Sequence, residues 1–240
     1  MQENLSVLRI REHRPSSLSL HHGMTEGERE VLDSLGLYHI MFMPEIRSNS
    51  GLLTALAERW HSETSSIHLP TGEATVTLED VWWILHILIA GEIVVYDPIV
   101  GRTALHRMFR CGDEGLGIHD YEIGWERLVA QHERLIAVIC WAMGGLVIPD
   151  RRGHGFPVGW GRVLERMVMD GVMFAWGPCM LGMLYYYLHQ VAYRGGLSIS
   201  AGVTLLQIWA YKHISMFQPV VDRELVDDMP YVYSYRGVIA

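Results

Sequence analysis

The sequence predicts a mainly α fold: a single multi-helix globular domain with a small β-hairpin inserted between two of its helices. Half of the 240 residues are apolar and only 19% are charged, which is typical of a globular protein with a large core. Several segments place apolar residues at helical spacing after a capping residue. One short stretch has the turn residues of a hairpin instead.

The first two helices are predicted from their caps. The sequence TEGE at residues 25–28 matches a capping box, and Gly36 is expected to end the helix that it begins. A second helix should begin near Ser48 or Asn49. It is expected to run through GLLTALAERWH, as far as His61.

The hairpin is predicted in the polar stretch RWHSETSSIHLPTGEATVTLEDVWW, which begins at Arg59. Residues 66–69 form the first predicted strand and residues 73–77 the return strand. Pro70, Thr71 and Gly72 lie between them, and they favour a turn because proline presets φ and glycine tolerates a positive φ.

Thr77 is predicted to cap a third helix, with Glu79 and Asp80 in its first turn, where the helix dipole favours acidic side chains. This helix is expected to continue to Gly91. Residues 93–96 are rich in β-branched side chains and predict a short strand. Loops are expected over residues 97–120, with a short helix near 103–110.

Longer helices are predicted in the second half of the chain. They are expected from Tyr121 to Met143, where a Gly-Gly pair ends the first, then over residues 159–170, and then from Trp176 to Arg194. The last strong helix should run through AGVTLLQIWAYKHI, with Ser198 or Ser200 as its cap and Pro219 beyond its end.

The stretch from Gly171 to Tyr193 contains no Asp, Glu, Lys or Arg, which is long enough to cross a bilayer. Gly177 and Pro178 interrupt it, and three tyrosines, a histidine and a glutamine crowd its second half. We therefore interpret it as part of a buried helix hairpin and expect no membrane partner.

The chain divides by composition into three parts. Residues 1–17 are polar and arginine-rich and are expected to form a flexible arm. Residues 18–219 should form the helical domain, and residues 220–240 a mixed C-terminal tail. The three cysteines form no C-x-x-C pair, which favours buried thiols in a reducing compartment.

Nucleic-acid binding is not favoured, because the formal net charge of −8 should repel phosphate backbones. If nucleic acid is contacted, the candidate residues are Arg151, Arg152 and Arg162.

No catalytic, cofactor or metal site is predicted. His61 and Glu63 match the H-x-E half of a zinc deaminase motif, but the cysteine pair of the other half is incomplete, and no H-E-x-x-H occurs. The only lysine is Lys212, so a P-loop cannot form. We interpret Lys212 as a solvent-facing charge and not as a Schiff-base lysine.

We therefore interpret the polar stretch as scaffolding. Arg59, Glu63, Glu73 and Asp80 are expected to form ion pairs and caps that hold the hairpin, while Thr64 and Thr77 bond to backbone amides. His68 is expected to be a hydrogen-bonded histidine. The alternative is an enzyme or ligand-binding pocket around Glu63, His68 and Glu73.

The same stretch resembles the signature of the plant mobile domain family. That signature appears here as Glu58-Arg59-Trp60, Glu63-Thr64, His68-Leu69-Pro70, Gly72-Glu73, Thr75, Thr77-Leu78 and Asp80-Val81. A second motif is similar to Phe174-Ala175-Trp176-Gly177, followed by Leu181, Leu184-Tyr185 and Leu188. A third appears as Leu205-Leu206-Gln207-Ile208-Trp209-Ala210. The resemblance covers residues 35–219. Ile67 replaces the usual Phe, and the family's G-L-P segment is missing after the capped helix.

The resemblance implies a non-catalytic protein-interaction domain of the nucleus. Such domains occur in plant transposable elements and in the MAINTENANCE OF MERISTEMS group, which is linked to transposon silencing, gene regulation and genome stability. It also implies protein partners, among them a serine/threonine phosphoprotein phosphatase. No cofactor is implied, since a single lysine does not support the "aminotransferase-like" label sometimes given to the family.

Overall fold

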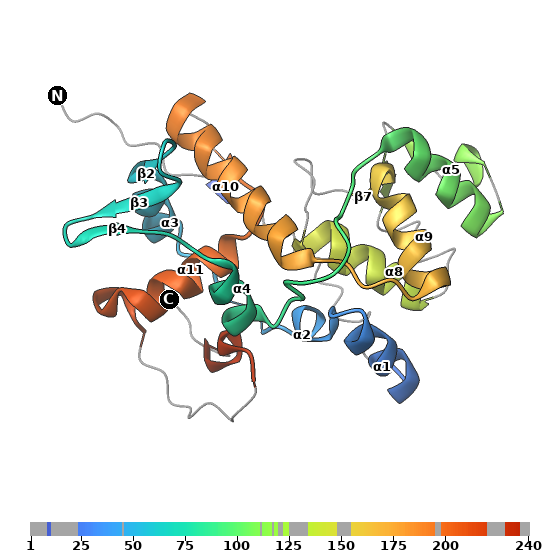
Figure 1. Ribbon diagram of the computed structural model, residues 1–240, viewed down its shortest axis with the longest axis horizontal. Coiled ribbons are helices and arrows are strands. Elements are labelled where there is room, and N and C mark those ends of the chain that lie inside the picture. The colour runs from blue at the N-terminus through green and yellow to red at the C-terminus, as the bar shows by residue number, and fades with distance from the viewer. Residues whose placement is uncertain are drawn as a thin grey trace. The chain divides into compact units, whose positions relative to one another are not determined.

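The mainly α fold with an inserted hairpin is confirmed. The computed structural model describes residues 9–10, 24–44, 46–110, 112–116, 118–119, 122–124, 134–147, 155–194, 198–219 and 229–235. Contacts divide the chain into two compact units (Figure 1). Unit 1 contains residues 1–12, 43–86 and 180–240, and unit 2 contains residues 13–42 and 87–179. The predicted arm and much of the predicted tail lie outside the described residues.

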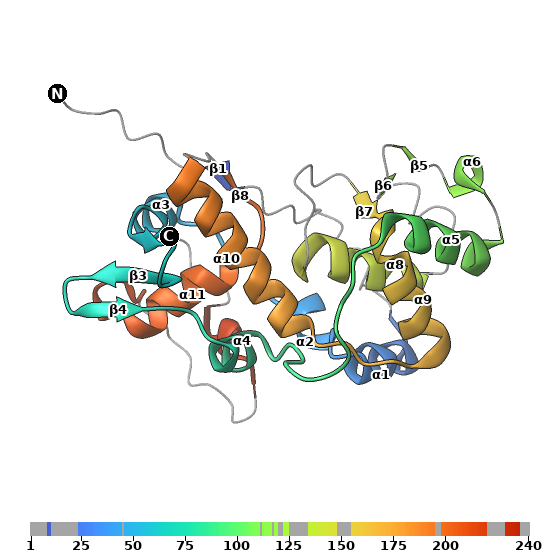
Figure 2. The ribbon, with the colours of Figure 1, turned by 45° about the horizontal axis from the view of Figure 1, so that its top comes forward.

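Unit 1 combines four helices with short strands (Figure 2). Its helices are α3 (Ser50–Glu58), α4 (Leu78–Leu85), α11 (Val203–His213) and the part of α10 (Trp176–Arg194) that begins at Met180. Two 3₁₀ helices follow, η4 (Ser215–Phe217) and η5 (Tyr231–Tyr235). The strands are β1 (Arg9–Ile10), β2 (Trp60–His61), β3 (Ser66–Leu69), β4 (Gly72–Ala74) and β8 (Ser198–Ile199), and β1 pairs with β8 in parallel.

The predicted hairpin is confirmed and gains a third strand. β3 and β4 are antiparallel, with His68 opposite Glu73, and Gly72 in the turn has a φ of +134°. The second helix was expected to reach His61, but α3 ends at Glu58. Trp60 instead pairs with Ile67 as part of β2, because the strand position buries the indole in the core.

Two of the three predicted caps in unit 1 are confirmed. The Asn49 side chain accepts a hydrogen bond from the amide of Leu52 at the start of α3, and Thr77 forms a capping box with Asp80 at the start of α4. The cap of α11 was wrongly placed: Gly202 holds this position, with a φ of +66°. Close packing requires a glycine there, since an added Cβ would lie 2.9 Å from Leu184 Cβ.

The end of α4 was also predicted wrongly. The helix stops at Leu85, since His86 adopts a left-handed conformation with a φ of +50°. The His86 ring stacks on Trp82 at 4.9 Å between centroids. The chain therefore leaves the helix well before Gly91.

α11 forms the centre of unit 1, because every residue from Val203 to Tyr211 is buried. It contacts both α3 and α4. An all-round buried helix needs cover on each side, which explains why its sequence reads as an apolar run without a polar face.

Unit 2 is built around two packed helices. Its helices are α1 (Glu26–Ser34), α2 (Tyr38–Met41), α5 (Pro98–Phe109), α6 (Asp113–Leu116), α8 (Arg134–Trp141) and α9 (Gly161–Asp170), with a π-helix η2 (Ala142–Val147) and a 3₁₀ helix η3 (Val158–Trp160). A small antiparallel sheet joins β5 (Ile118–His119), β6 (Glu122–Gly124) and β7 (Gly155–Pro157). The predicted capping box at Thr25 and the ending of α1 near Gly36 are confirmed.

The contact between α5 and α9 depends on glycines. A Cβ on Gly101 would lie 2.2 Å from Val158 O, and a Cβ on Gly161 would lie 2.2 Å from Gly101 O. Larger residues would force these segments apart, so the backbones approach closely only because both positions are glycine.

Three predictions in unit 2 were wrong. α5 fills a region expected to be mostly loop, because Asp97 caps it through the amides of Ile99 and Val100 and Pro98 occupies its first turn. Residues 93–96 form no strand; only Glu92 makes a bridge, to Phe174. The helix expected from Tyr121 is replaced at 122–124 by β6, and the later helix continues through the Gly-Gly pair as η2.

The predicted helix from Trp176 to Arg194 is confirmed as α10. Within the described part of the chain, the model contains no helix with the length and apolar character that a bilayer crossing requires.

Candidate functional site

Most of the signature residues meet in unit 1, where the hairpin lies next to α10 and α11. We call this the signature cluster; it includes Trp60, Ser66, His68, Glu73, Thr75, Thr77, Asp80, Tyr185, His189, Gln207 and His213. Its side chains form several short hydrogen-bonded groups, most of which join segments that are distant in sequence.

The first group joins the hairpin to α10 through Tyr185. The Tyr185 hydroxyl donates to Val76 O at 2.6 Å and lies 2.9 Å from the Thr75 hydroxyl. The Thr75 hydroxyl also lies 2.8 Å from Ser65 O; because it carries a single proton, it donates either to that carbonyl or to the Tyr185 hydroxyl. Tyr185 thus holds the end of the hairpin at the point where the chain turns into α4.

The second group uses His189, one helical turn beyond Tyr185. Trp60 Nε1 donates to His189 Nδ1 at 3.3 Å, and His189 Nε2 lies 3.0 Å from Ser62 O. His189 Nδ1 also lies 2.8 Å from Tyr185 O, the carbonyl one helical turn before it. Trp60 also packs against Tyr185, with ring centroids 5.1 Å apart. His189 is a member of the cluster that the sequence did not reveal.

The third group surrounds the Glu73 carboxylate on the open face of the hairpin. Ser66 donates to Glu73 at 2.6 Å, and the Thr64 hydroxyl lies 2.7 Å from that of Ser66. His68 Nε2 lies 2.9 Å from Glu73 Oε1, a distance that suits an ion pair without hydrogen-bond geometry. The His68 ring stacks on His61 at 3.5 Å.

These neighbours lower the pKa of Glu73. The main cause is the hydrogen bond from Ser66; Thr64, His68 and His61 add to it, and desolvation opposes it. A depressed carboxylate pKa is the opposite of what a general acid at neutral pH requires. The predicted role of Glu73 in holding the hairpin agrees with this geometry.

Asp80 is nearly buried, at 8% exposure, and both of its oxygens are used. Oδ2 accepts from the amide and hydroxyl of Thr77 at 2.9 and 2.8 Å. Oδ1 lies 3.1 Å from His213 Nε2 at the end of α11. The capping carboxylate therefore also links α4 to α11.

Gln207 is buried in α11 and ties it to the start of α3. Its Oε1 accepts from the amide of Asn49 at 2.7 Å, and its Nε2 donates to Arg47 O and to the Tyr211 hydroxyl, each at 3.0 Å. Burial raises the pKa of Tyr211, although the hydrogen bond from Gln207 lowers it in part. Trp209 is buried between these contacts and His213.

The other signature residues of the first motif do not converge on a reactive centre. Arg59 donates to Ala55 O within α3. Glu63 is exposed, and it makes no hydrogen bond or ion pair with any residue that the structure describes. The ion pairs expected of these two residues are absent from the described part of the chain. Leu69 and Pro70 lie beside the hairpin turn.

Trp176 and Gly177 lie apart from the cluster, in unit 2. Trp176 is fully buried and packs against Phe174. The amide of Gly177 donates to Leu88 O at 2.8 Å. These contacts hold the start of α10 against the segment that follows α4.

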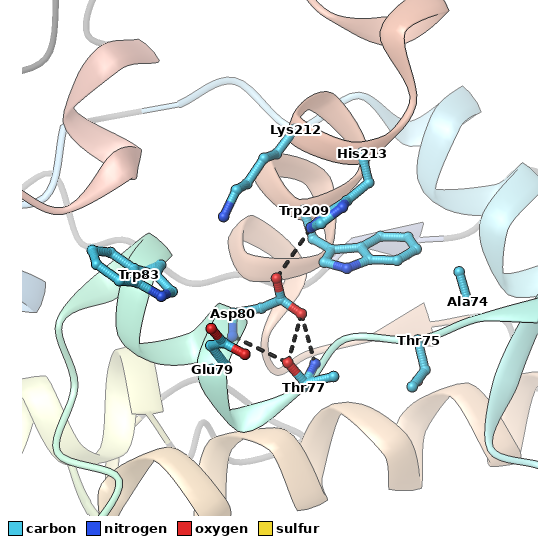
Figure 3. Close-up of a pocket in the computed structure, with 9 residues that line it drawn as sticks. All are labelled: Ala74, Thr75, Thr77, Glu79, Asp80, Trp83, Trp209, Lys212 and His213. Atoms are coloured by element: carbon cyan, nitrogen blue, oxygen red, sulfur yellow. Dashed lines mark hydrogen bonds and ion pairs between the residues drawn. The ribbon is translucent and has the colours of Figure 1, made fainter.

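A pocket of about 560 Å³ lies beside the signature cluster (Figure 3). It is lined by Ala74, Thr75, Thr77, Glu79, Asp80, Trp83, Trp209, Lys212 and His213. Its volume is in the range of small-ligand sites, but its residues differ from the predicted group of Glu63, His68 and Glu73. Lys212 is exposed at the pocket, as predicted, and lies 5.7 Å from the Tyr231 ring.

The pocket lining carries both acidic and basic side chains, namely Glu79, Asp80, Lys212 and His213. The Asp80–His213 contact resembles the base–orienter pair of hydrolases, but both Asp80 oxygens are already engaged by Thr77 and His213. Among the described residues, no three His, Cys, Asp or Glu side chains are arranged to hold a metal ion.

The candidate nucleic-acid residues do not form a free basic surface in the described part of the chain. Arg162 pairs with Glu165 at 2.6 Å, and Arg107 pairs with the same carboxylate at 2.8 Å. The Arg107 and Arg162 guanidinium groups lower the pKa of Glu165. Arg151 and Arg152 lie outside the described residues.

Two of the three cysteines are described. Burial raises the pKa of the Cys140 thiol strongly and that of the Cys179 thiol to about 11. Thiols with a raised pKa are poor nucleophiles. The predicted burial is met by Cys140, whereas Cys179 is only partly buried. Cys111 lies outside the described residues.

Comparison with known proteins agrees with the resemblance seen in the motifs. Protein MAIN-LIKE 2 of Arabidopsis thaliana is 27% identical over 229 residues, covering 87% of this chain and 33% of that protein. Protein MAINTENANCE OF MERISTEMS of the same plant is 26% identical over 230 residues, covering 89% of this chain and 47% of that protein. A third relative, "Serine/threonine-protein phosphatase 7 long form homolog", is 28% identical over 209 residues, covering 79% of this chain and 15% of that protein.

This chain spans less than half the length of each of these relatives. No solved structure matches it. The family model described as plant mobile domain matches residues 36–238. The chain therefore belongs to the plant mobile domain family.

Proposed function

We propose that this chain is a non-catalytic protein-interaction domain that acts in nuclear gene regulation, transposon silencing or genome stability. The observation that carries the proposal is a division of labour between polar and apolar side chains. The signature side chains Asp80, Tyr185 and Gln207 form their hydrogen bonds with other residues of unit 1. Large apolar side chains, by contrast, are displayed on the surface.

The exposed apolar residues are of the kind that carries binding energy at protein interfaces. Trp83 is 53% exposed, and Trp82 precedes it on the same helix; Met216 and Phe217 are exposed after α11. Tryptophan is enriched among the residues that contribute most to protein–protein binding. Exposed groups of this size mark interaction surfaces more often than chemistry.

The relatives suggest the kind of partner. One of them is named as a serine/threonine phosphatase and contains a similar stretch within a longer protein. Two others carry the MAINTENANCE OF MERISTEMS and MAIN-LIKE names. A phosphoprotein phosphatase is therefore our candidate partner for this chain, and a fluorescent fusion in plant cells is expected to localise to the nucleus.

The test is isothermal titration calorimetry of the purified chain with the purified phosphatase 7 long form homolog, which measures their dissociation constant. The proposal expects a complex that Trp83→Ala weakens at least about 10-fold. Glu63→Gln, which changes an exposed signature residue, should leave the affinity unchanged. Absence of a complex would remove the phosphatase from the proposal. Substrate turnover that is lost in His213→Gln would contradict a non-catalytic role and favour an enzyme centred on the pocket.

A further inference from the structure

Residues Ile93, Val94 and Val95 have the sequence of a strand but pair with no strand in the part of the chain that the structure describes. The segment leads from Glu92, which bridges to Phe174 in parallel, to Asp97, whose φ and ψ are extended. Figure 1 draws it as a long open connection between α4 and α5. Three β-branched residues in a row favour pairing with another strand, so the absence of a neighbour needs an explanation.

The backbone groups of Ile93, Val94 and Val95 have no hydrogen-bond partner among the described residues. Glu92, in contrast, donates to Met173 O at 3.0 Å and accepts from Ala175 N at 2.9 Å.

The direction of the free groups follows from the geometry of extended chains. Successive residues point their N–H and C=O groups to opposite edges. Since Glu92 faces residues 173–175, an extended path through Ile93 and Val95 directs their groups to the other edge, where the next amide of the same parity, that of Asp97, donates to Gly159 O at 3.2 Å. Such an edge pairs readily with another strand unless something blocks it.

The exposed side chains around this edge are apolar. Ile93 is 82% exposed, Val95 is 62% exposed and Ile99 is 80% exposed. Val100 and Tyr96 are also exposed, and so is Met173, whose carbonyl bonds to Glu92. Taking about 150–250 Å² for each fully exposed side chain, the upper part of which applies to aromatic rings, these residues present roughly 550–900 Å². A standard interface buries about 600–1,000 Å² on each partner.

The charges beside the edge are already compensated. Glu92 pairs with Arg166, which lowers the pKa of the Glu92 carboxyl. Asp97 accepts from two amides at the start of α5. No charged residue lies between Glu92 and Asp97, so a neutral, apolar strand would pair best with this edge.

The edge is complementary to itself. In an antiparallel pairing centred on Val94, Ile93 of one copy lies opposite Val95 of the other, and Glu92 lies opposite Tyr96. This register places the most exposed β-branched side chains on one face as cross-strand neighbours, and it sets no like charges opposite one another. A two-fold axis through Val94 closes the pair.

We propose that two copies of this chain dimerise through antiparallel pairing of residues 93–95, with Ile93 and Val95 exchanging backbone hydrogen bonds across the two-fold axis. A second copy supplies the neighbouring strand that these residues lack within the described part of the chain. The dimer does not depend on the proposed nuclear function or on the phosphatase partner.

The first test is sedimentation equilibrium on the full chain, whose monomer mass is 27.4 kDa, from about 1 µM to 1 mM. The proposal expects the mass to double with rising concentration. Val95→Lys, which places a charge on the edge, should raise the dissociation constant at least about 10-fold. Val31→Lys is the matched control, because Val31 is 40% exposed on α1 and away from the edge; it should leave the constant unchanged.

The second test uses the wild-type chain and measures hydrogen exchange of individual amides by NMR. In the dimer the amides of Ile93 and Val95 should be protected, while that of Val94, which faces the other edge, should exchange freely. A chain that stays monomeric at 1 mM overturns the proposal. So does a dimer that Val95→Lys leaves intact, or one in which the amides of Ile93 and Val95 remain unprotected and another surface makes the contact.

Discussion

Replacing Gln207 tests whether the third signature motif stabilises the fold. Gln207 is 1% exposed and makes three hydrogen bonds, two of which join α11 to the start of α3 while the third reaches Tyr211 within α11. Each such bond contributes about 1 kcal/mol net. Gln207→Ala should therefore lower the free energy of unfolding by about 3 kcal/mol, and by somewhat more if the amide of Asn49 is left without a partner.

Two further variants separate hydrogen bonding from packing. Gln207→Leu keeps a side chain of similar volume but makes no hydrogen bond, so it should cost nearly as much as Gln207→Ala. Gln218→Ala removes an exposed glutamine beyond η4 and should change stability by less than about 0.5 kcal/mol.

The assay is urea denaturation followed by circular dichroism, with a thermal melt as a second readout. For a chain of this length, about 3 kcal/mol corresponds to a fall in melting temperature of about 6–12 °C. A loss below about 1 kcal/mol for both Gln207 variants would refute the reasoning, because it would mean that water replaces these bonds without cost. A large loss for Gln207→Ala alone would show that packing is the main contribution.

Three other predictions follow from single contacts. Glu73→Gln should destabilise the chain at pH 7. This difference in stability should vanish as pH falls through the depressed pKa of Glu73, because a lowered folded-state pKa contributes stability only above that range. Urea denaturation from pH 7 to pH 3 checks this, and a difference that persists at pH 3 would contradict it. The Cys179 thiol has a pKa of about 11, so it should react with iodoacetamide at pH 7.5 on the order of 100-fold more slowly than an unperturbed thiol. Mass spectrometry of the labelled peptides measures this rate. Labelling at the rate of a free thiol would show that the Cys179 side chain is accessible to solvent. Gly101→Ala should destabilise unit 2 by at least about 2 kcal/mol, because its Cβ would meet Val158 O. Gly27→Ala on α1 should be neutral or stabilising, because nothing lies within 4 Å of the added Cβ. Equal effects of the two substitutions would argue against the close approach of α5 and α9.

Local patterns in the sequence predicted much of this fold. The caps at Thr25, Asn49 and Thr77 were recognisable because each acts within three residues. The turn at Gly72 and the uncharged run of α10 were likewise readable from neighbouring residues. These features depend on interactions between residues that are close together in the sequence.

The failures have a different physical origin. Trp60 continues the helical pattern of α3, but tertiary burial draws it into β2. Residues 93–96 have strand propensity, but propensity forms no strand without a partner. Gly202 replaces the expected serine cap because Leu184 packs against it.

The composition of the site was only partly predictable. Glu73, Thr77 and Asp80 act as expected, since their partners are close in sequence. The contact of Tyr185 with Thr75 and that of Gln207 with Asn49 join residues 110 and 158 positions apart. His189 and His213 each follow a signature aromatic residue by four positions, which is a helical spacing that could have marked them.

The most direct test of the scaffolding account is a double-mutant cycle between Thr75→Val and Tyr185→Phe, measured by urea denaturation. These hydroxyls lie 2.9 Å apart and connect the hairpin to α10. The account predicts a coupling energy of at least about 0.5 kcal/mol between them. Additive effects within about 0.3 kcal/mol would show that the two groups do not stabilise each other, and the account would then be wrong.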